Sequence, residues 1–271
     1  MFAAIASLLQ KVLMKDDKSD PHAYSIAFQL LGSAIVATFA LSHGFVMPPI
    51  SAYPINFLLL AVLYGCGTLC LFNAYKHLEA SEVTIVTSVR AVVTIVSAVV
   101  ILGEVFSLQK GLGTVLILAS VFIISERVGK IKLNKGMLYA FGMAVFFGLA
   151  ITNDTYLLKH VDLYSYVTIG FLLPGLFLAV VKPKKLLELK PFLKARTFGK
   201  MFVFTSFYAA SALCFYQAIN NGANASQATP VLQSTVIVTV ILAAIFLKER
   251  DKILKKILCA ILVTIGVVLL S

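Results

Sequence analysis

Long apolar segments alternate with short polar breaks along this chain. Most of these segments run for about 18 to 23 residues, the length that an α-helix needs to cross the hydrocarbon core of a bilayer. A transmembrane β-barrel would instead show segments of about ten residues with alternating hydrophobicity. The pattern predicts an all-α polytopic membrane protein with about ten transmembrane helices, near residues 1–14, 23–42, 55–76, 81–102, 107–125, 137–157, 163–181, 200–219, 225–247 and 253–270.

The composition leads to the same class. Of the 271 residues, 60% are hydrophobic and 13% are charged, and the mean hydropathy is +0.95. A soluble domain of this length needs a polar shell, which this composition does not provide. The polar breaks are short, such as KDDKSDPH after the first span and KPKKLLELKPFLKARTFGK after the seventh. Any function is therefore expected to be carried out within or across the bilayer.

The two halves of the sequence are copies of each other. They align with a nearly constant offset of 144 or 145 residues, as three pairs of segments illustrate: EASEVTIV (79–86) with NASQATPV (224–231), residues 100–125 with residues 244–271, and FAAIASLLQKVLMK (2–15) with FFGLAITNDTYLLK (146–159). Such self-similarity at a fixed spacing indicates repeated structural units. The chain is therefore expected to hold two five-helix repeats, residues 1–127 and residues 128–271.

An odd number of spans in each repeat has a geometric consequence. The second copy must enter the membrane from the opposite side, so the two repeats are inverted. Inverted repeats are typical of secondary transporters, whose substrate site lies near the midplane between the halves. The sixth span begins about eight residues earlier than its counterpart, the first span, can begin. Either the protein continues upstream of residue 1 or its first helix is shortened.

Several motifs resemble those of a known family. Each half ends with a Gly-Glu or Lys-Glu step before its final apolar helix, within ILGEVFSLQKGLG in the first half and FLKER in the second. Together with ASEVT and NASQATPV, these stretches resemble the EamA family of the drug/metabolite transporter superfamily over nearly the whole chain. The resemblance implies an exporter or exchanger of small metabolites and makes Glu104 and Glu249 fold markers. The proline usual in the fourth helix of each copy occurs here only as Pro230, with Ile85 in the first copy, so the halves are expected to bend differently.

One arginine, Arg90, lies in the middle of the predicted span 81–102. A charge at the bilayer centre costs about 2.5–3.5 kcal/mol, and such residues usually face the interior of the bundle. Arg90 can hold helices together by pairing with Asp154 or by binding the carbonyls of a broken helix. Alternatively, it faces a central cavity and binds a carboxylate or phosphate in bidentate fashion, which we favour. Its counterpart in the second copy is Thr235, next to Gln233.

Asp154 is the carboxylate placed well inside a predicted span, and its counterpart in the first copy is Gln10. An apolar setting favours the uncharged form of a carboxyl group. Asp154 is therefore a candidate either for carrying a proton during transport or for neutralising Arg90, and the sequence does not separate the two roles.

Further polar residues occupy matched positions in the two copies. The segments FNAYKH (72–77) and FYQAIN (215–220) align with each other. A polar residue on a membrane helix often makes a plain interhelix hydrogen bond. Paired elements of inverted repeats tend to line the shared site, however, which favours a substrate contact. The substrate-binding candidates are Arg90, Asn73, Tyr75, Tyr216, Gln217, Gln233 and Thr235.

The sequence contains no recognisable cofactor, metal or catalytic motif. The cysteines lie in apolar spans without the histidines of a zinc site, and no phosphate-cradling glycine motif occurs. We expect no enzyme activity, cofactor, metal or nucleic-acid partner. The expected partners are a small-molecule substrate and the lipid bilayer, with the protein a monomer or a weak homodimer. The alternatives are an exchanger of phosphorylated or nucleotide sugars, a non-transporting scaffold or lipid-handling protein, and an intramembrane enzyme.

The basic residues are distributed unevenly among the loops. The formal net charge is +11, and 20 of the 23 Lys and Arg residues fall in or next to loops that follow odd-numbered spans. The positive-inside rule places these loops in the cytoplasm and both chain ends outside. The family resemblance places both ends in the cytoplasm instead, so the orientation stays open. The protein is expected in the cell membrane.

Overall fold

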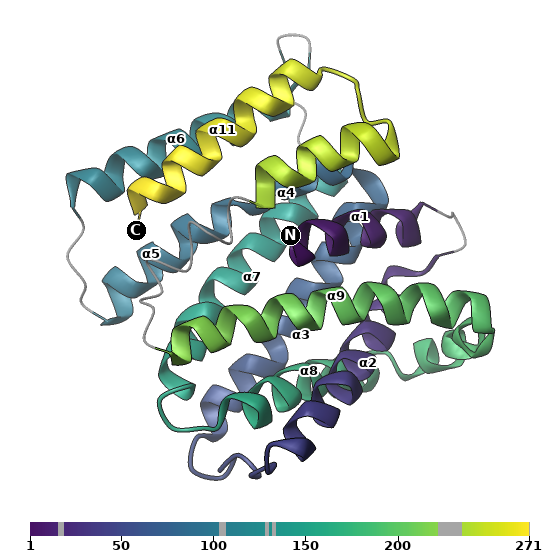
Figure 1. Cartoon of the computed structure of the whole chain (residues 1–271). Coiled ribbons are helices and arrows are strands. Elements are labelled where there is room, and N and C mark those ends of the chain that lie inside the picture. Colours follow the sequence, from purple (N-terminus) through teal and green to yellow (C-terminus); the bar gives the residue numbers. More distant parts are fainter. Residues whose placement is uncertain (16–18, 103–106, 128–129, 132–133, 222–234, 271) are drawn as a thin grey trace.

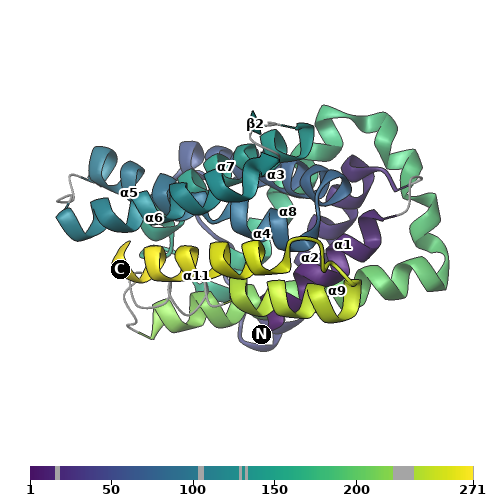
Figure 2. The same ribbon diagram turned by 90° about the horizontal axis from the view of Figure 1, so that it is seen from above.

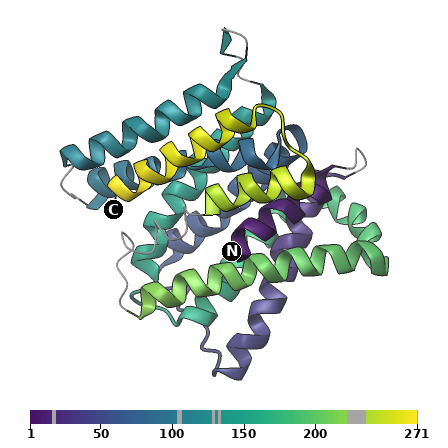
Figure 3. The ribbon, with the colours of Figure 1, turned by 45° about the horizontal axis from the view of Figure 1, so that its top comes forward.

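The computed structural model describes residues 1–15, 19–102, 107–127, 130–131, 134–221 and 235–270, and these residues form a bundle of helices (Figure 1). Two antiparallel strands of two residues each, β1 (Glu126–Arg127) and β2 (Lys130–Ile131), project beyond the end of α6 (Figure 3). The helices are α1 (Phe2–Met14), α2 (Pro21–Ser42), α3 (Pro54–His77), α4 (Ala80–Thr87), α5 (Val89–Leu102), α6 (Leu108–Ser125), α7 (Lys135–Leu157), α8 (Leu163–Val181), the 3₁₀-helix η1 (Pro183–Leu193), α9 (Ala195–Asn220), a helix over Thr235–Leu247 that ends in the π-helix η2 (Ala243–Leu247), and α11 (Ile253–Leu270).

Six of the described helices are long and apolar enough to cross a membrane. Three shorter apolar helices accompany them, including α1 with its 13 residues. At a rise of about 1.5 Å per residue, α1 covers about 20 Å of the roughly 30 Å hydrocarbon core. These helices lie where the sequence pattern places them, but the structure does not establish that ten helices cross the membrane.

The predicted fourth span is divided in two at Ser88. Its hydroxyl donates to the carbonyl oxygen of Ile85 at 2.6 Å, and α5 starts at the next residue, Val89. Ser88 itself keeps a right-handed helical backbone conformation, with φ −62° and ψ −20°, so the interruption between α4 and α5 is confined to a single residue. No proline lies in this segment, whereas the equivalent segment of the second copy contains Pro230. The interruption at Ser88 is therefore not caused by a proline.

Equivalent helices of the two copies pack against each other in antiparallel pairs. His22, near the start of α2, bonds the carbonyl oxygen of Leu178 near the end of α8 at 2.9 Å. The helices α6 and α11 lie side by side (Figures 1 and 2) and approach closely: a Cβ added at Gly266 of α11 would stand 2.8 Å from the carbonyl oxygen of Gly113. Small residues allow such close packing of membrane helices. Antiparallel equivalents are what inverted repeats require.

Other pairs of packed helices also join one copy to the other. Helix α3 packs along α7, and their equivalents α9 and α1 also pack on each other (Figure 3). The start of α3 meets the end of α7, where Asn56 Nδ2 donates to Asn153 Oδ1 at 2.7 Å. Helices of both copies are therefore interleaved in the bundle.

Side chains at the helix starts supply the caps that isolated helix ends lack. The side chain of Asp20 accepts a hydrogen bond from the N–H of Ala23 in α2, and Asn134 and Asp162 do the same at the starts of α7 and α8. The start of α4 is capped from the other half of the chain. There the buried carboxylate of Glu249 accepts from the N–H groups of Ala80 at 2.9 Å and Ser81 at 3.2 Å.

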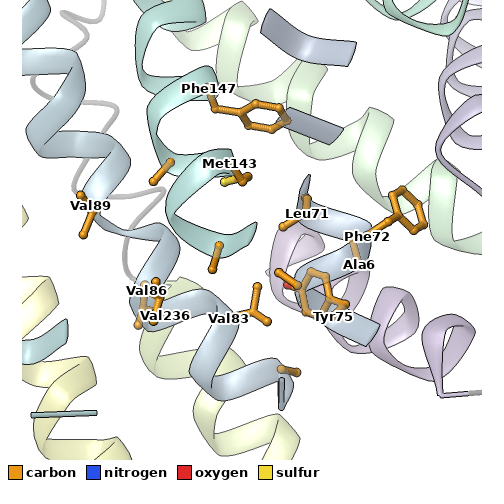
Figure 4. Close-up of a cluster of buried hydrophobic side chains, with 14 of the residues drawn as sticks. Ala6, Leu71, Phe72, Tyr75, Val83, Val86, Val89, Met143, Phe147 and Val236 are labelled. Carbon is orange, nitrogen blue, oxygen red and sulfur yellow. The ribbon is translucent and has the colours of Figure 1, made fainter. Parts of the chain in front are cut away.

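A cluster of buried apolar side chains fixes the centre of the bundle (Figure 4). It joins Tyr75 of α3, Val83 of α4 and Phe147 of α7 to neighbours from α1 and from the segment after residue 235. The outer surface is also apolar, since large side chains such as Val100, Val180 and Leu254 are about four-fifths exposed. Exposed apolar side chains of this number suit a surface that lipid covers.

Candidate functional site

A cavity of about 200 Å³ lies at the centre of the bundle. Its walls come from α1, α2, α3, α4, α5, α7, α8 and α9, together with Thr235. Both halves of the chain therefore contribute to one cavity. Hydroxyl and amide groups from several of these helices face it, among them Ser7, Gln10, Gln29, Thr68, Thr84 and Ser211.

Aromatic rings form much of the apolar wall. Phe28 packs edge-on against Phe171, with ring centroids 5.7 Å apart, and against Tyr208 at 4.9 Å. Phe147 lines the cavity and also belongs to the buried cluster of Figure 4. Because this wall is continuous with the core, its shape is set by the packing of the bundle.

Arg90 is the charged side chain among the described residues that line the cavity. It is half-buried and is the second residue of α5, directly after the break at Ser88. Its guanidinium interacts electrostatically with the hydroxyl of Tyr208 on α9. Within the described part of the chain, the structure shows no ion pair between Arg90 and a carboxylate. The break in the helix thus presents an unpaired guanidinium to the cavity.

The position of Arg90 along α7 explains why it does not reach Asp154. A Cβ at Gly148 of α7 would stand 3.0 Å from the carbonyl oxygen of Arg90, and Thr94 Oγ1 donates to the carbonyl oxygen of Gly148 at 3.2 Å. Asp154 lies six residues further along α7, which is about 9 Å along the helix axis. Of the two roles that the sequence leaves open for Arg90, the ion pair with Asp154 is not present in the structure, where tyrosine hydroxyls bind the carboxylate.

Asp154 is bound instead by three tyrosine hydroxyls. Its side chain is buried, with 2% of the residue exposed. Tyr64 and Tyr216 both donate to Oδ2, Tyr216 at 2.7 Å, and Tyr166 donates to Oδ1. The three tyrosines come from α3, α9 and α8, and all of them line the cavity. Asp154 is thus separated from the cavity by a shell of phenols.

The neighbours of Asp154 on α7 have partners of their own. Asn153 exchanges two hydrogen bonds with Asn56, and the hydroxyl of Thr152 lies 2.7 Å from that of Ser97. The polar stretch at the end of α7 is therefore held from α3 and α5. This fixes the position of the Asp154 carboxylate.

An amide on the opposite wall is only partly satisfied. Gln29 Nε2 donates to Thr68 Oγ1 at 2.7 Å, whereas Gln29 Oε1 is buried and has no hydrogen-bond partner. Gln10, the counterpart of Asp154 in the first copy, is buried and lines the same cavity. An unsatisfied buried acceptor is costly, and a ligand or water that donates to it removes that cost.

The candidates from the sequence divide into two groups. Arg90, Tyr75, Tyr216 and Thr235 line the cavity. Asn73 does not line it, because its amide donates to the carbonyl oxygen of Leu69 in its own helix at 2.8 Å, and Gln217 Nε2 is directed to Asn221 Oδ1 at 3.0 Å. Neither Asn73 nor Gln217 lines the cavity.

The remaining residues singled out from the sequence lie at helix ends or outside the described residues. Gln233 and Glu104 lie outside the described residues. Glu249, named from the resemblance as a fold marker, is buried, with 8% of the residue exposed, and its carboxylate caps α4. No group of His, Cys, Asp and Glu side chains able to hold a metal ion occurs among the described residues.

Two residues of the site were not singled out from the sequence, Tyr64 and Tyr166. A signal existed for Tyr64: the offset of 144 that aligns Asn73 with Gln217 also aligns Tyr64 with Tyr208, and both tyrosines line the cavity. No comparable pattern singles out Tyr166, because an aromatic residue in an apolar span resembles any other core residue.

Comparison with known proteins identifies the family. A model of the EamA-like transporter family matches the chain twice, over residues 1–126 and 134–271. The chain belongs to the EamA-like transporter family. As a member of this family, it is an integral, multi-pass membrane protein, and the resemblance that its sequence motifs carry is confirmed.

The other comparisons add the fold. Among the curated proteins, none matches the sequence. One solved structure, described as a crystal structure of a protein, is 12% identical over 99% of this chain and 96% of its own length, with a TM-score of 0.62. At this identity the likeness shows that the fold of the EamA-like chain is shared, and it carries no information on the substrate.

Proposed function

We propose that this protein is a secondary carrier, an exporter or exchanger, that moves a small organic anion through the central cavity by alternating access. The observation that carries the proposal is Arg90: a guanidinium at a helix break, unpaired among the described residues, in the wall of a cavity that both halves build. A charge held inside a membrane bundle without a counter-ion is costly and is typical of substrate pathways.

The architecture supports alternating access. We propose ten spans in two inverted repeats, residues 1–127 and 128–271, and the two matches of the family model over 1–126 and 134–271 fit this division. The interruption between α4 and α5 at Ser88 lies in the cavity wall, and interrupted helices beside a cavity are typical of transporter sites. The antiparallel packing of α2 with α8 and of α6 with α11 gives two similar units able to rock about the cavity.

The walls indicate the substrate class. One guanidinium matches one carboxylate or phosphonate group in bidentate geometry. The aromatic side chains Phe28, Phe147, Phe171 and Phe215 surround the rest of the space and suit an apolar body. A phosphorylated or nucleotide sugar carries more negative charge and many hydroxyls, so this lining favours a monoanion over that alternative.

A ligand-stabilisation experiment tests the proposal. Four probes share one ring and differ in charge: benzoate, phenyl phosphate, benzamide and benzylamine. Thermal unfolding of the detergent-purified protein is measured with each probe for the parent, for Arg90→Gln and for Arg196→Gln. The last variant is a matched control, because Arg196 is exposed at the start of α9, outside the cavity. A ligand at 100 times its Kd stabilises the state that it binds by about 2.7 kcal/mol.

We expect benzoate to raise the melting temperature of the parent and of Arg196→Gln, and not that of Arg90→Gln. Equal stabilisation of all three proteins would remove Arg90 from the site. Stabilisation by phenyl phosphate in preference to benzoate would favour the sugar-phosphate alternative. Flux separates a carrier from a scaffold: in proteoliposomes preloaded with benzenesulfonate, a monoanion on the same ring that has no membrane-permeant neutral form at neutral pH, a carrier exchanges the labelled anion across the bilayer, whereas a scaffold or lipid-handling protein does not.

A further inference from the structure

The carboxylate of Asp154 is placed next to the transport cavity but not in its wall. Three phenol hydroxyls lie between it and the cavity, and each phenol ring lines the cavity. The shell is completed by a contact of 3.2 Å between the hydroxyls of Tyr64 and Tyr216. Any change at the carboxylate is therefore transmitted to the cavity through tyrosine hydroxyls.

The hydrogen bonds that the carboxyl group of Asp154 can make differ between its ionised and its protonated form. An ionised carboxylate only accepts, so all three hydroxyls donate to it, two to Oδ2 and one to Oδ1. A protonated carboxyl group has one O–H to donate, and the acceptors beside it are the phenol oxygens. A phenol that accepts this proton directs its own O–H elsewhere: Tyr64 and Tyr216 can donate to each other, and the other open direction is the cavity.

Protonation thus changes what the cavity offers to a ligand. With Asp154 ionised, the tyrosines turn their donors away from the cavity and present oxygen lone pairs to it. With Asp154 protonated, the cluster of one carboxyl group and three phenols holds one more proton, so a phenol O–H is available to donate to a ligand in the cavity. A hydroxyl donor favours an anion, whereas a row of lone pairs disfavours one.

The charge balance leads to the same coupling. Arg90 lines the cavity and Asp154 lies behind the phenols, so the empty site is neutral when both are ionised. A bound monoanion leaves one uncompensated negative charge in a medium of low polarity, which is costly. Uptake of one proton restores neutrality.

The groups that face Asp154 from the elements packed around α7 are few. They are Tyr64 from α3, Tyr166 from α8 and Tyr216 from α9, with Tyr208 of α9 next to Tyr216. From α5 the nearest charge is Arg90, whose backbone lies at the level of Gly148. Among the described residues, no second carboxylate shares this site, so the proton has one destination.

We propose that Asp154, with Tyr64, Tyr166 and Tyr216, is the proton-binding site of this carrier, and that one proton and one organic anion occupy the protein together. The coupling of the proton to an anion rests on the proposed function. The assignment of Asp154 as the proton-binding residue rests on the tyrosine shell. The proton comes from water, reaches the carboxylate through a phenol hydroxyl and leaves by the same route, and no bond other than an O–H bond forms or breaks.

The first arm of the test needs no substrate. Infrared difference spectra of the reconstituted protein are recorded between about pH 4 and about pH 9, an interval that contains most perturbed carboxyl groups of proteins. We expect a C=O band of a buried carboxylic acid to titrate in the parent, to be absent in Asp154→Asn and to persist in Asp251→Asn, a matched control at an exposed loop position. Tyr216→Phe, which keeps the carboxyl group and removes one donor, should shift the band.

The second arm measures coupling with benzoate as the probe. A pH-indicator dye in weakly buffered solution records protons taken up when benzoate binds. We expect about one proton per bound benzoate for the parent and for Asp251→Asn, and no proton for each benzoate that Asp154→Asn binds.

Two outcomes overturn the proposal. If no titrating band depends on Asp154, the residue is not a proton-binding site. If the parent binds benzoate without taking up a proton, the coupling is wrong. The proposed function fails separately: benzoate then binds neither the parent nor the variants, and the infrared arm alone decides whether Asp154 binds a proton.

Discussion

Asp154 and Arg90 carry opposite charges inside the same bundle, and they differ in burial and in hydrogen-bond partners. The carboxylate of Asp154 is buried and receives three hydrogen bonds from α3, α8 and α9. The guanidinium of Arg90 is half-buried, lines the cavity and has no ion pair with the described residues. One charge is therefore satisfied by the fold, and the other has no ion pair among the described residues, as the proposed anion site requires.

The difference shows how a membrane protein separates two uses of charge. A charge that has all its partners holds helices in position and costs the fold little. A charge without partners keeps its full desolvation cost until something binds to it. The comparison predicts that the two residues respond in opposite ways when they are removed.

The largest effect is expected from replacing each charge by leucine. Asp154→Leu leaves three phenol donors without their acceptor, and an unsatisfied buried group costs about 1–3 kcal/mol. We expect a loss of about 3 kcal/mol or more in unfolding free energy. Arg90→Leu removes a charge whose placement in a membrane costs about 2.5–3.5 kcal/mol and should leave stability unchanged or raise it, while anion binding is lost. Thermal and denaturant unfolding in detergent measure both, and a larger loss for Arg90→Leu would reverse the comparison.

A third buried charge, Glu249, extends the comparison to a helix end. Its carboxylate accepts from Ala80 N, Ser81 N and Ser81 Oγ, so it resembles Asp154 in being satisfied. Loss of a helix N-cap costs about 0.5–2 kcal/mol, and we expect Glu249→Ala to lie near the upper end because three donors lose their acceptor. Asp251→Ala, two positions further on and exposed, is the control. Equal melting temperatures for the two variants would show that the cap contributes nothing.

Single removal of the phenol hydroxyls gives a smaller and graded effect. Each Tyr→Phe change deletes one hydrogen bond to Asp154, worth about 1 kcal/mol. Tyr166→Phe should cost the most, because Tyr166 is the partner found for Oδ1, whereas Tyr64 and Tyr216 share Oδ2. Tyr208→Phe, in the cavity wall but not bonded to Asp154, is the control. Three equal losses would mean that the shell rearranges when one hydroxyl is removed.

The sequence predicts the helices well because each is a long apolar run. The predicted span 163–181 coincides with α8 (Leu163–Val181), and the predicted span 55–76 lies within α3 (Pro54–His77). The break at Ser88 was not predicted. It lies inside a run of apolar and hydroxyl residues that looks continuous in the sequence.

The site was predicted less completely, for a physical reason. A charge in an apolar span is conspicuous, so Arg90 and Asp154 were both found from the sequence. Whether two such charges meet depends on the axial position of each helix, which sequence spacing does not give, and the pairing of Arg90 with Asp154 failed on this point. Tyrosines in spans are ambiguous between core and site, and the shell around Asp154 became visible only when three helices were assembled.

The smallest effect is expected from a charge pair outside the spans, where water replaces the bundle as the environment. Lys185 Nζ of η1 lies 2.8 Å from both Asp20 and Glu188. Burial alone would raise the pKa of Asp20, but hydrogen bonds from Lys185 and from the N–H of Ala23 outweigh it and hold that pKa below its usual value. The same hydrogen bonds, to Asp20 and then Glu188, raise the pKa of Lys185.

The sign of the pH dependence follows from these two shifts. A lowered Asp pKa gives stability that is present above the unfolded-state pKa and is lost as pH falls through the folded-state value. A raised Lys pKa gives stability that is present below its unfolded-state pKa and is lost as pH rises through the folded-state value. The pair should therefore stabilise the link from η1 to α2 across the whole neutral range, and the difference in melting temperature between the parent and Asp20→Asn should vanish at the acid edge. Because the pair is only partly buried and borders water, salt should weaken it, unlike the Asp154 shell, and an effect that salt leaves unchanged would contradict this.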